Sequence, residues 1–220
     1  MVEDSPKGGA GGRTAANAVF KGVAIAPSAT GGPLLYAADV ANARIDVFNK
    51  RFQPVDDSGA FADPSLPKGY APFNIQLISN DLYVTYGKQN KTKTDVVTGD
   101  GLGVVDVFTE NGKLVKHLVS NGASSPLDAP WGVAMAPAKF GPFGGDLLVG
   151  NLGNGWINAF NPTTGKFLGT LDDSLGYPVT IDGLWGLSIG NSDFGGASSL
   201  VFSAGPEGYA DGLLGVINPG

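Results

Sequence analysis

One strand pattern recurs four times along this chain, and the spacings between the copies are 52, 58 and 54 residues. Each copy contains three apolar runs of 4–7 residues bounded by Gly, Pro, Asn or Asp, which is typical of short β-strands. The first runs are KGVAIAP (21–27), FNIQLIS (73–79), WGVAMAP (131–137) and WGLSIGN (185–191). The second runs are 34–39, 82–87, 147–152 and 200–205, and the third runs are 43–49, 103–109, 155–161 and 212–218.

A fourth run completes three of the copies, at 52–55, 114–119 and 167–171, and the chain ends before the last copy reaches its own. Gly-containing hairpin loops at 109–113 and 161–166 join third to fourth runs. Repeats of about 50 residues with four strands each are typical of a β-propeller, in which stacked blades bury each other's faces. The sequence therefore predicts an all-β fold with four four-stranded blades.

The predicted organisation is a flexible lead at 1–16 and one propeller domain at 17–220. Its repeat units are 17–70, 71–128, 129–181 and 182–220. Exposed sheet edges invite aggregation, so the ring needs closure. Either TAANAVF (14–20) supplies the missing outer strand of the last blade and closes a four-bladed monomer, or two partial propellers pair as a homodimer.

Composition excludes several function classes. The net charge is −6 and no basic cluster is present, which disfavours nucleic acid as a partner. No apolar stretch approaches the ~20 residues needed to span a bilayer, and the first residues lack the features of a signal peptide. Cysteine is absent, which excludes disulfides and thiolate metal sites.

Several segments resemble a family of bacterial secreted propellers related in architecture to six-bladed NHL and TolB-like propellers. The most specific are GYAPFNI (69–75), PWGVAMAP (130–137), 147–171, IDGLWGL (181–187) and AGPEGYADGLLG (204–215). The resemblance implies a secreted or cell-envelope location. It also implies about two further blades ahead of the point where this chain begins. The loop KQNKTKTDVVTGDG (88–101) departs from the acidic, His-containing stretch expected in that family.

The face where blades open is the default ligand site of a propeller. The predicted ligand-binding residues open the first strands or lie in loops between second and third strands. They are Lys21, Asp39, Asn42, Phe73, Asn74, Trp131, Asn151, Asn154 and Trp185, and Lys88 and Asp100 occupy the equivalent loop of the second copy. Trp131 and Trp185 either stack on a flat ligand such as a sugar or fill the axis as core. Trp156 is interpreted as packing between blades.

Carboxylates are the available catalytic groups, because the single histidine rules out a Ser–His–Asp triad or a His-rich metal site around the axis. Glu207 with Asp211 or Asp182 is the predicted acid–base pair, of the kind that acts across a glycosidic bond. The Asp and Asn residues of the loops either bind Ca²⁺ or cap their own turns.

Two features receive structural interpretations. Asp46, Asp106 and Asn158 occupy one equivalent third-strand position, with Gly215 in the last copy, and are predicted to be hydrogen-bonding residues. His117 lies in an outermost run and is predicted to be a surface histidine.

Two functions follow as hypotheses. The first is a propeller that binds a small molecule, glycan or protein at its funnel face. The second is a carboxylate- or Ca²⁺-dependent hydrolase or lyase acting on a polysaccharide, lactone or ester. A scaffold without either activity is a third.

Overall fold

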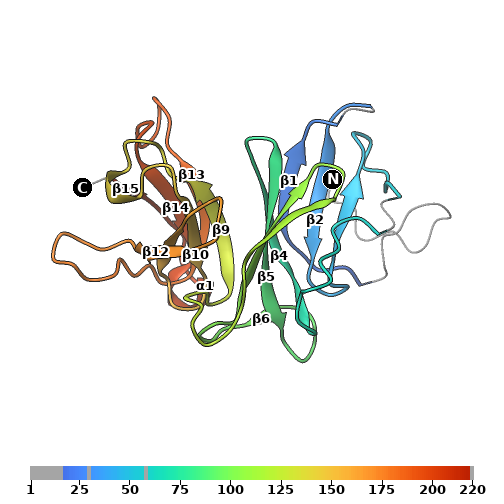
Figure 1. The fold of residues 1–220 in the computed structure, drawn as a ribbon, viewed down its shortest axis with the longest axis horizontal. Coiled ribbons are helices and arrows are strands. Elements are labelled where there is room, and N and C mark those ends of the chain that lie inside the picture. The colour runs from blue at the N-terminus through green and yellow to red at the C-terminus, as the bar shows by residue number, and fades with distance from the viewer. Residues whose placement is uncertain (1–16, 29–30, 57–58, 219–220) are drawn as a thin grey trace. The chain divides into compact units, whose positions relative to one another are not determined.

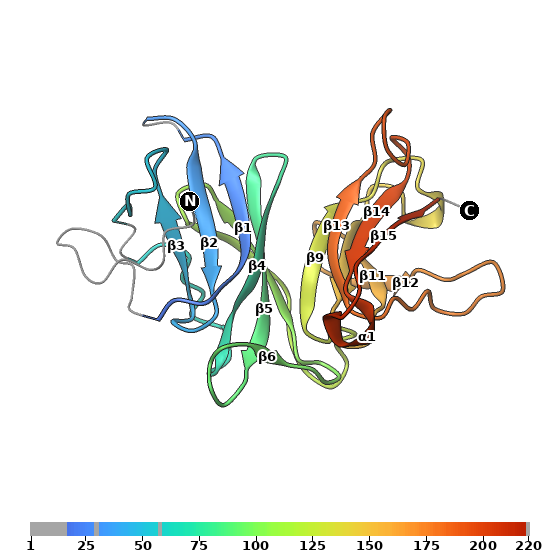
Figure 2. The same ribbon diagram turned by 180° about the vertical axis from the view of Figure 1, so that it is seen from behind.

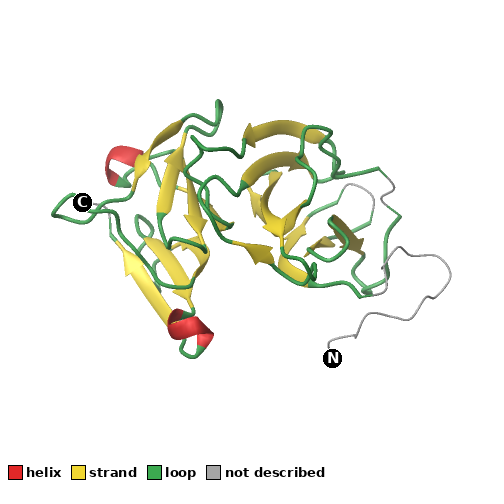
Figure 3. Cartoon of the chain, turned by 90° about the horizontal axis from the view of Figure 1, so that it is seen from below, coloured by secondary structure: helices red, strands yellow, loops and turns green. Residues whose placement is uncertain are grey.

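The fold is almost entirely antiparallel β-sheet. A computed structural model describes residues 17–28, 31–56 and 59–218. Strands dominate these residues, and the helical segments are the 3-10 turn η1 (Gly141–Phe143) and the short α1 (Pro206–Tyr209) (Figure 3). Within the described residues no helix is long and apolar enough to cross a membrane. The predicted lead at 1–16, which includes residues 14–16 of the predicted closing strand, lies outside the described residues.

The strands form four sheets, one for each repeat (Figure 1). Their bounds match the predicted runs to within a few residues. The first sheet contains β1 (Phe20–Ala26), β2 (Leu34–Asp39) and β3 (Arg44–Phe48). The second contains β4 (Tyr70–Ile78), β5 (Asp81–Gln89), β7 (Val104–Thr109) and β8 (Leu114–Val119), with β6 (Val96–Val97) paired to β5.

The last two sheets come from the C-terminal half of the chain. β9 (Pro130–Met135), β10 (Leu147–Asn151), β11 (Ile157–Phe160) and β12 (Phe167–Thr170) form a four-stranded sheet in sequence order. β13 (Leu184–Ile189), β14 (Leu200–Ala204) and β15 (Leu213–Ile217) form a three-stranded one, and α1 lies between β14 and β15 (Figure 2). Phe20, the last residue of the predicted closing strand, belongs to β1 and pairs with Asp39.

The predicted outer strand at 52–55 is reduced to a single bridge between Phe48 and Pro54. Val55 donates a backbone hydrogen bond to Val47, at 2.8 Å. The Asn49 amide donates to the Gln53 carbonyl on the other side of the bridge, so Pro54 sits at a position where its missing N–H removes no bond to β3.

The chain groups into two compact units. Unit 1 comprises the described residues of Met1–Val97 with Val104–His117, and unit 2 comprises Thr98–Gly103 with Leu118–Gly220 as far as described. Unit 1 has its own core around Tyr36, Ile75, Leu82 and Phe108, and unit 2 has one around Leu148, Ile157, Leu184 and Leu200. Each unit therefore buries two neighbouring sheets against each other, as the repeat pattern requires.

Candidate functional site

Each first strand carries a β-bulge at the position that opens the predicted strand. In β1 and β4 the register shifts at Lys21 and Phe73, and in β9 and β13 it shifts at Trp131 and Trp185 with the glycine that follows each. A bulge breaks the alternation of side chains along a strand and turns the bulged residue away from the sheet. The four positions selected from the sequence are thus structurally equivalent.

Two of the glycines that follow the bulges permit close approach between first strands. A Cβ on Gly22 would overlap Asn74 and lie 2.8 Å from its Cα, and a Cβ on Gly132 would lie 2.5 Å from the Trp185 carbonyl oxygen. β1 accordingly packs on β4 within unit 1, and β9 packs on β13 within unit 2. In unit 2 this packing brings Trp131 and Trp185 together.

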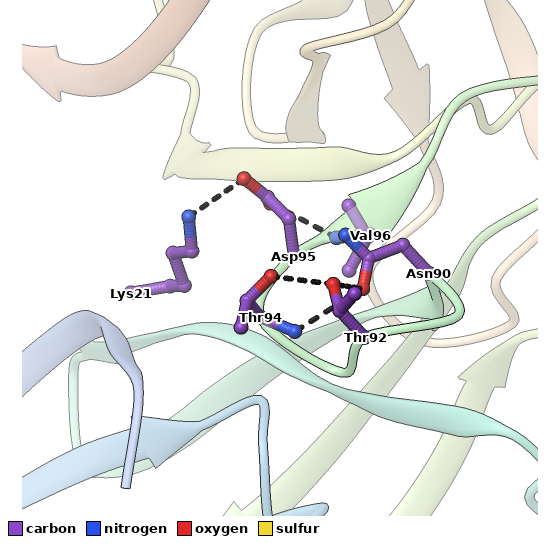
Figure 4. A network of polar contacts seen from close by, with 6 residues as sticks. All are labelled: Lys21, Asn90, Thr92, Thr94, Asp95 and Val96. Atoms are coloured by element: carbon purple, nitrogen blue, oxygen red, sulfur yellow. Dashed lines mark hydrogen bonds and ion pairs between the residues drawn. The ribbon is translucent and has the colours of Figure 1, made fainter. Parts of the chain in front are cut away.

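The Lys21 ammonium group forms an ion pair with a residue of the loop that follows β5. Its Nζ donates to Asp95 Oδ2 at 2.8 Å (Figure 4). Asp95 belongs to the loop between β5 and β6, in the segment 88–101 that departs from the family pattern. Asn90 Oδ1 closes this loop by accepting from Thr92 Oγ1 and the Thr94 amide. The predicted cationic ligand contact is therefore a partly exposed ion pair in this structure.

The predicted loop residues of the first and third repeats cap turns. Asp39 Oδ1 accepts from the amides of Val19, Ala41 and Asn42, and its Oδ2 accepts from Asn42 Nδ2 at 2.6 Å. Asn151 Nδ2 donates to the Pro126 carbonyl and to Asn154 Oδ1. These bonds engage the Asp39 carboxylate and Asn154 Oδ1, which favours the turn-capping interpretation for those two residues. Asn151 Oδ1, the atom of that side chain that calcium would use, accepts no hydrogen bond from the described residues.

The remaining predicted ligand-binding residues differ in exposure. Phe73 and Asn74 are buried within unit 1. Lys88 and Asp100 are exposed. Trp156, which was interpreted as packing between blades and not as a ligand contact, is partly exposed and donates from Nε1 to Thr180 Oγ1 at 3.1 Å, within unit 2.

Three aromatic side chains form a connected cluster in unit 2. The rings of Trp131 and Trp185 meet edge to face at 5.6 Å, and Trp185 lies 5.7 Å from the ring of Tyr209 in α1. Trp131 and Trp185 are partly exposed, and Tyr209 is 58% exposed. We call this set the aromatic platform. A Cβ on Gly205 would lie 2.7 Å from Tyr209 Cδ1, so this glycine leaves room for the tyrosine ring.

The three predicted catalytic carboxylates lie in α1 or in the segments next to it. Asp182 Oδ2 accepts a hydrogen bond from the Glu207 amide at 3.0 Å, which ties the loop before β13 to the α1 turn. Glu207, Gly208 and Tyr209 all have positive φ, so α1 contains a left-handed turn that non-glycine residues adopt at a cost. Asp182, Glu207 and Asp211 are all exposed. The structure thus places all three predicted carboxylates in the segments that surround α1, which carries Tyr209 of the aromatic platform.

A second polar group, in unit 1, was not predicted. His117 Nδ1 lies 2.8 Å from Asp63 Oδ2 and 2.9 Å from Asp106 Oδ1. The side chains of Asp63 and Asp106 are 1% and 0% exposed, and that of His117 is 24% exposed. The predicted surface histidine is thus partly exposed and contacts two buried carboxylates, an arrangement that the sequence did not indicate. We call these three residues the acid–imidazole cluster.

Burial and hydrogen bonding shift the pKa values of this cluster in opposite directions. Burial and the Asp63 charge raise the pKa of Asp106 to about 7, against the opposing effect of His117. The hydrogen bonds from Ser65 and His117 outweigh desolvation at Asp63 and lower the pKa of its carboxyl. Burial, with the charges of Asp106 and Asp63, raises the pKa of Tyr86 well above its usual value, so that hydroxyl stays protonated.

The equivalence of Asp46, Asp106 and Asn158 is confirmed by the register. They pair with Ala37, Val84 and Val149 at one position of each sheet. Asn158 has the predicted structural role, because it accepts from Thr170 Oγ1 and donates to the Pro126 carbonyl. Gly215 pairs with Phe202, whose ring occupies the space that a side chain would need.

Two surface hollows are lined by residues other than the predicted site residues. One of about 340 Å³ in unit 1 is lined by residues such as Leu34, Asn49 and Gln53. Another of about 240 Å³ in unit 2 is lined by residues such as Phe140, Leu171 and Ile217. Neither hollow includes a residue of the aromatic platform.

Sequence comparison finds viral relatives. No family model matches the chain. Two uncharacterised proteins of Acanthamoeba polyphaga mimivirus are each 36% identical to it, over 205 and 204 residues. These alignments cover 90% of this chain and 48% and 50% of the relatives, so the chain spans about half the length of the curated relatives it matches. The expected bacterial origin of the resemblance is not supported.

Structure comparison finds propellers. A gluconolactonase from Xanthomonas campestris aligns with a TM-score of 0.51 and 16% identity, covering 85% of this chain and 59% of that one. An inactive variant of virginiamycin B lyase from Staphylococcus aureus, solved with quinupristin, aligns at 0.50 and 14% identity, covering 93% and 57%. At these identities the likeness concerns the fold alone. The chain therefore has the predicted propeller-like fold, built of four antiparallel sheets.

Proposed function

We propose that this chain is a ligand-binding propeller and that the aromatic platform in unit 2 binds a carbohydrate ring. The observation that carries the proposal is the platform itself, in which Trp185 contacts both Trp131 and Tyr209 and all three remain partly or largely exposed. Clustered exposed aromatics are costly on a surface and mark binding sites. A pyranose ring offers an apolar face of matching size.

The polar surroundings of the platform suit a sugar. Binding sites combine apolar surface with a few placed polar groups that fix orientation. Here these groups are the carboxylates of Asp182, Glu207 and Asp211 and the hydroxyl of Ser203, all exposed. Ser203 Oγ already accepts from the Gly186 amide at 3.1 Å, so its remaining hydrogen is directed elsewhere. Carboxylates accept hydrogen bonds from vicinal hydroxyls, which predicts a neutral sugar and disfavours an acidic one.

Calorimetric titration with a panel of neutral and acidic oligosaccharides tests the proposal. Trp185→Ala should weaken binding at least about tenfold, equivalent to about 1.4 kcal/mol. Trp156→Phe is the matched control, since that indole contacts Thr180 and lies outside the platform. Binding retained in Trp185→Ala, or lost equally in Trp156→Phe, would contradict the assignment.

A second candidate function is a hydrolase or lyase at the same platform. The observation that favours it is the left-handed turn at Glu207 to Tyr209, because strained backbone of this kind concentrates at functional sites. Glu207 and Asp211 would then act as acid and base on a lactone, ester or glycosidic bond. Two of the structural neighbours are named as a lyase and a gluconolactonase, which supports a search for turnover.

Turnover assays distinguish the two candidates. Glu207→Gln should abolish turnover of esters, lactones or polysaccharides while the melting temperature stays unchanged, and Asp193→Asn, another exposed carboxylate of unit 2, should be silent. Binding without turnover in the wild type supports the first candidate. The same assays with calcium or with a chelator test the predicted dependence on Ca²⁺.

A further inference from the structure

Three potential ligand atoms converge in unit 1, from separate parts of the chain. His117 Nδ1 lies 2.8 Å from Asp63 Oδ2 and 2.9 Å from Asp106 Oδ1, and all three atoms lie within 4.8 Å of one another. Asp63 comes from the linker before β4, Asp106 from β7 and His117 from β8. Among the described residues this is the group of three acidic or imidazole side chains with metal-ligand spacing.

The cluster holds more negative charge than its own residues can balance. Two carboxylates with 1% and 0% side-chain exposure face a single imidazole, so one negative charge remains when both are ionised, even if His117 is protonated. Burying an uncompensated charge is costly, and proteins avoid it by pairing, protonation or metal coordination. A cation at this point would balance the charge.

Asp106 supplies an independent indication. It is fully buried, and no contact with the described residues gives either carboxylate oxygen a hydrogen bond of ordinary geometry, although the Tyr86 hydroxyl and His117 Nδ1 both lie beside it. Asp63, in contrast, is oriented from behind: its Oδ1 accepts from the Ser65 amide and hydroxyl at 2.8 and 2.6 Å. This arrangement directs Asp63 Oδ2 at the cluster and resembles the outer hydrogen bonds that orient metal ligands.

The equivalent location in the third sheet has a purely structural role. There Asn158 takes the position of Asp106, and its amide bonds to Thr170 on the outer strand and to the Pro126 carbonyl in the preceding linker. In the third sheet, neutral hydrogen-bonding groups therefore connect the linker, the third strand and the outer strand. In the second sheet, two carboxylates and an imidazole connect the same three segments, although neutral groups would be sufficient for a structural role.

We propose that Asp63, Asp106 and His117 bind one divalent first-row transition-metal ion such as Zn²⁺ or Mn²⁺. Neighbouring donors lie about 3.4 Å apart around a tetrahedral Zn²⁺ ion, and about 3.0 Å apart along the edge of an octahedron such as Mn²⁺ prefers, with donors at ~2.1 Å. The observed separations of 2.8 and 2.9 Å match that edge. Ca²⁺ fits less well, because it takes six to eight oxygen ligands at longer distances. The partial exposure of His117 gives the ion and its remaining water ligands a route in.

The composition of the chain makes the test direct. His117 is the only histidine and cysteine is absent, so imidazole coordination can occur at one place in the untagged protein. Metal-free full-length chain is titrated with Zn²⁺ and with Mn²⁺ at pH 7.5 by calorimetry, and the ¹⁵N signals of the single imidazole are followed by NMR. The expected result is one ion per chain, with the Nδ1 signal shifted by coordination to Zn²⁺.

Variants decide whether the cluster is the site. Asp106→Asn reproduces the residue found in the third sheet and should fold, yet it should weaken binding by more than about tenfold, as should His117→Gln. Asp193→Asn, an exposed carboxylate in unit 2, should leave the affinity unchanged. The absence of stoichiometric binding in the wild type, or binding that persists in both cluster variants, would overturn the proposal and leave a shared proton as the compensating charge.

Discussion

Replacing Gly132 by alanine tests the close packing that brings Trp131 and Trp185 together. The added Cβ would lie 2.5 Å from the Trp185 carbonyl oxygen and 2.9 Å from the Leu187 amide nitrogen. Both obstacles are backbone atoms, which cannot rotate away as a side chain can. β9 and β13 must therefore separate, and the edge-to-face contact of the two indoles must open.

The expected cost follows from the nature of these contacts. Overpacking a tight site costs about 1–3 kcal/mol, and contact with rigid backbone favours the upper half of that range. For a chain of this length about 2–3 kcal/mol corresponds to a fall in melting temperature of about 5–10 °C. Thermal unfolding followed by circular dichroism measures the shift, and sugar affinity should fall with it.

Gly212→Ala is the matched control, because no atom lies within 4 Å of its added Cβ and its φ is not positive. This variant should melt at the wild-type temperature or slightly above it, since alanine restricts the unfolded chain. Equal melting temperatures for the Gly132 and Gly212 variants would refute the packing described for β9 and β13.

Two further predictions concern stability. Phe73→Ala should lower the free energy of unfolding by about 3–5 kcal/mol in urea denaturation, because Phe73 is fully buried, whereas Val115→Ala, at a side chain that is 55% exposed, should cost far less. Burial raises the pKa of Asp128 despite the hydrogen bond from the Gly99 amide, with a further increase from Asp100. Folded protein therefore binds this proton more tightly than unfolded chain does, so stability should fall as pH rises from the ordinary aspartate pKa through the raised one. Asp128→Asn should remove that fall and Asp100→Asn should reduce it; an unchanged pH profile in both would contradict the assignment.

Local pattern was enough to predict most of the strands, although the run at 52–55 forms only a bridge and β6 was not predicted. Apolar runs bounded by Gly, Pro and Asn carry strand position in a few consecutive residues, so β2 was predicted with its observed bounds, Leu34–Asp39. The equivalence of Asp46, Asp106 and Asn158 could also be predicted, because each occupies the same position in the third apolar run of its copy. The segment α1 was not predicted, since nothing in PEGY indicates a left-handed turn at Glu207 and Tyr209.

Contacts between distant segments could not be predicted from the sequence. Asp63 and His117 are 54 residues apart, and the linker that carries Asp63 has no strand pattern to set its path. The sequence placed Trp131 and Trp185 at equivalent positions, but their meeting depends on the bulges and on the room left by Gly132. Two features of the sequence could have indicated these contacts. One is the glycine after each of these tryptophans, and the other is the lone histidine on the outer strand of the same repeat as Asp106.

The most direct measurement of the central claim is an NMR titration of the indole N–H signals with the sugar that binds most tightly. The chain has three tryptophans, so the spectrum contains three such signals. If the platform in unit 2 is the binding surface, the signals of Trp131 and Trp185 shift with saturation and that of Trp156 stays in place. A shift confined to Trp156, or no shift in any of them during confirmed binding, would contradict the account.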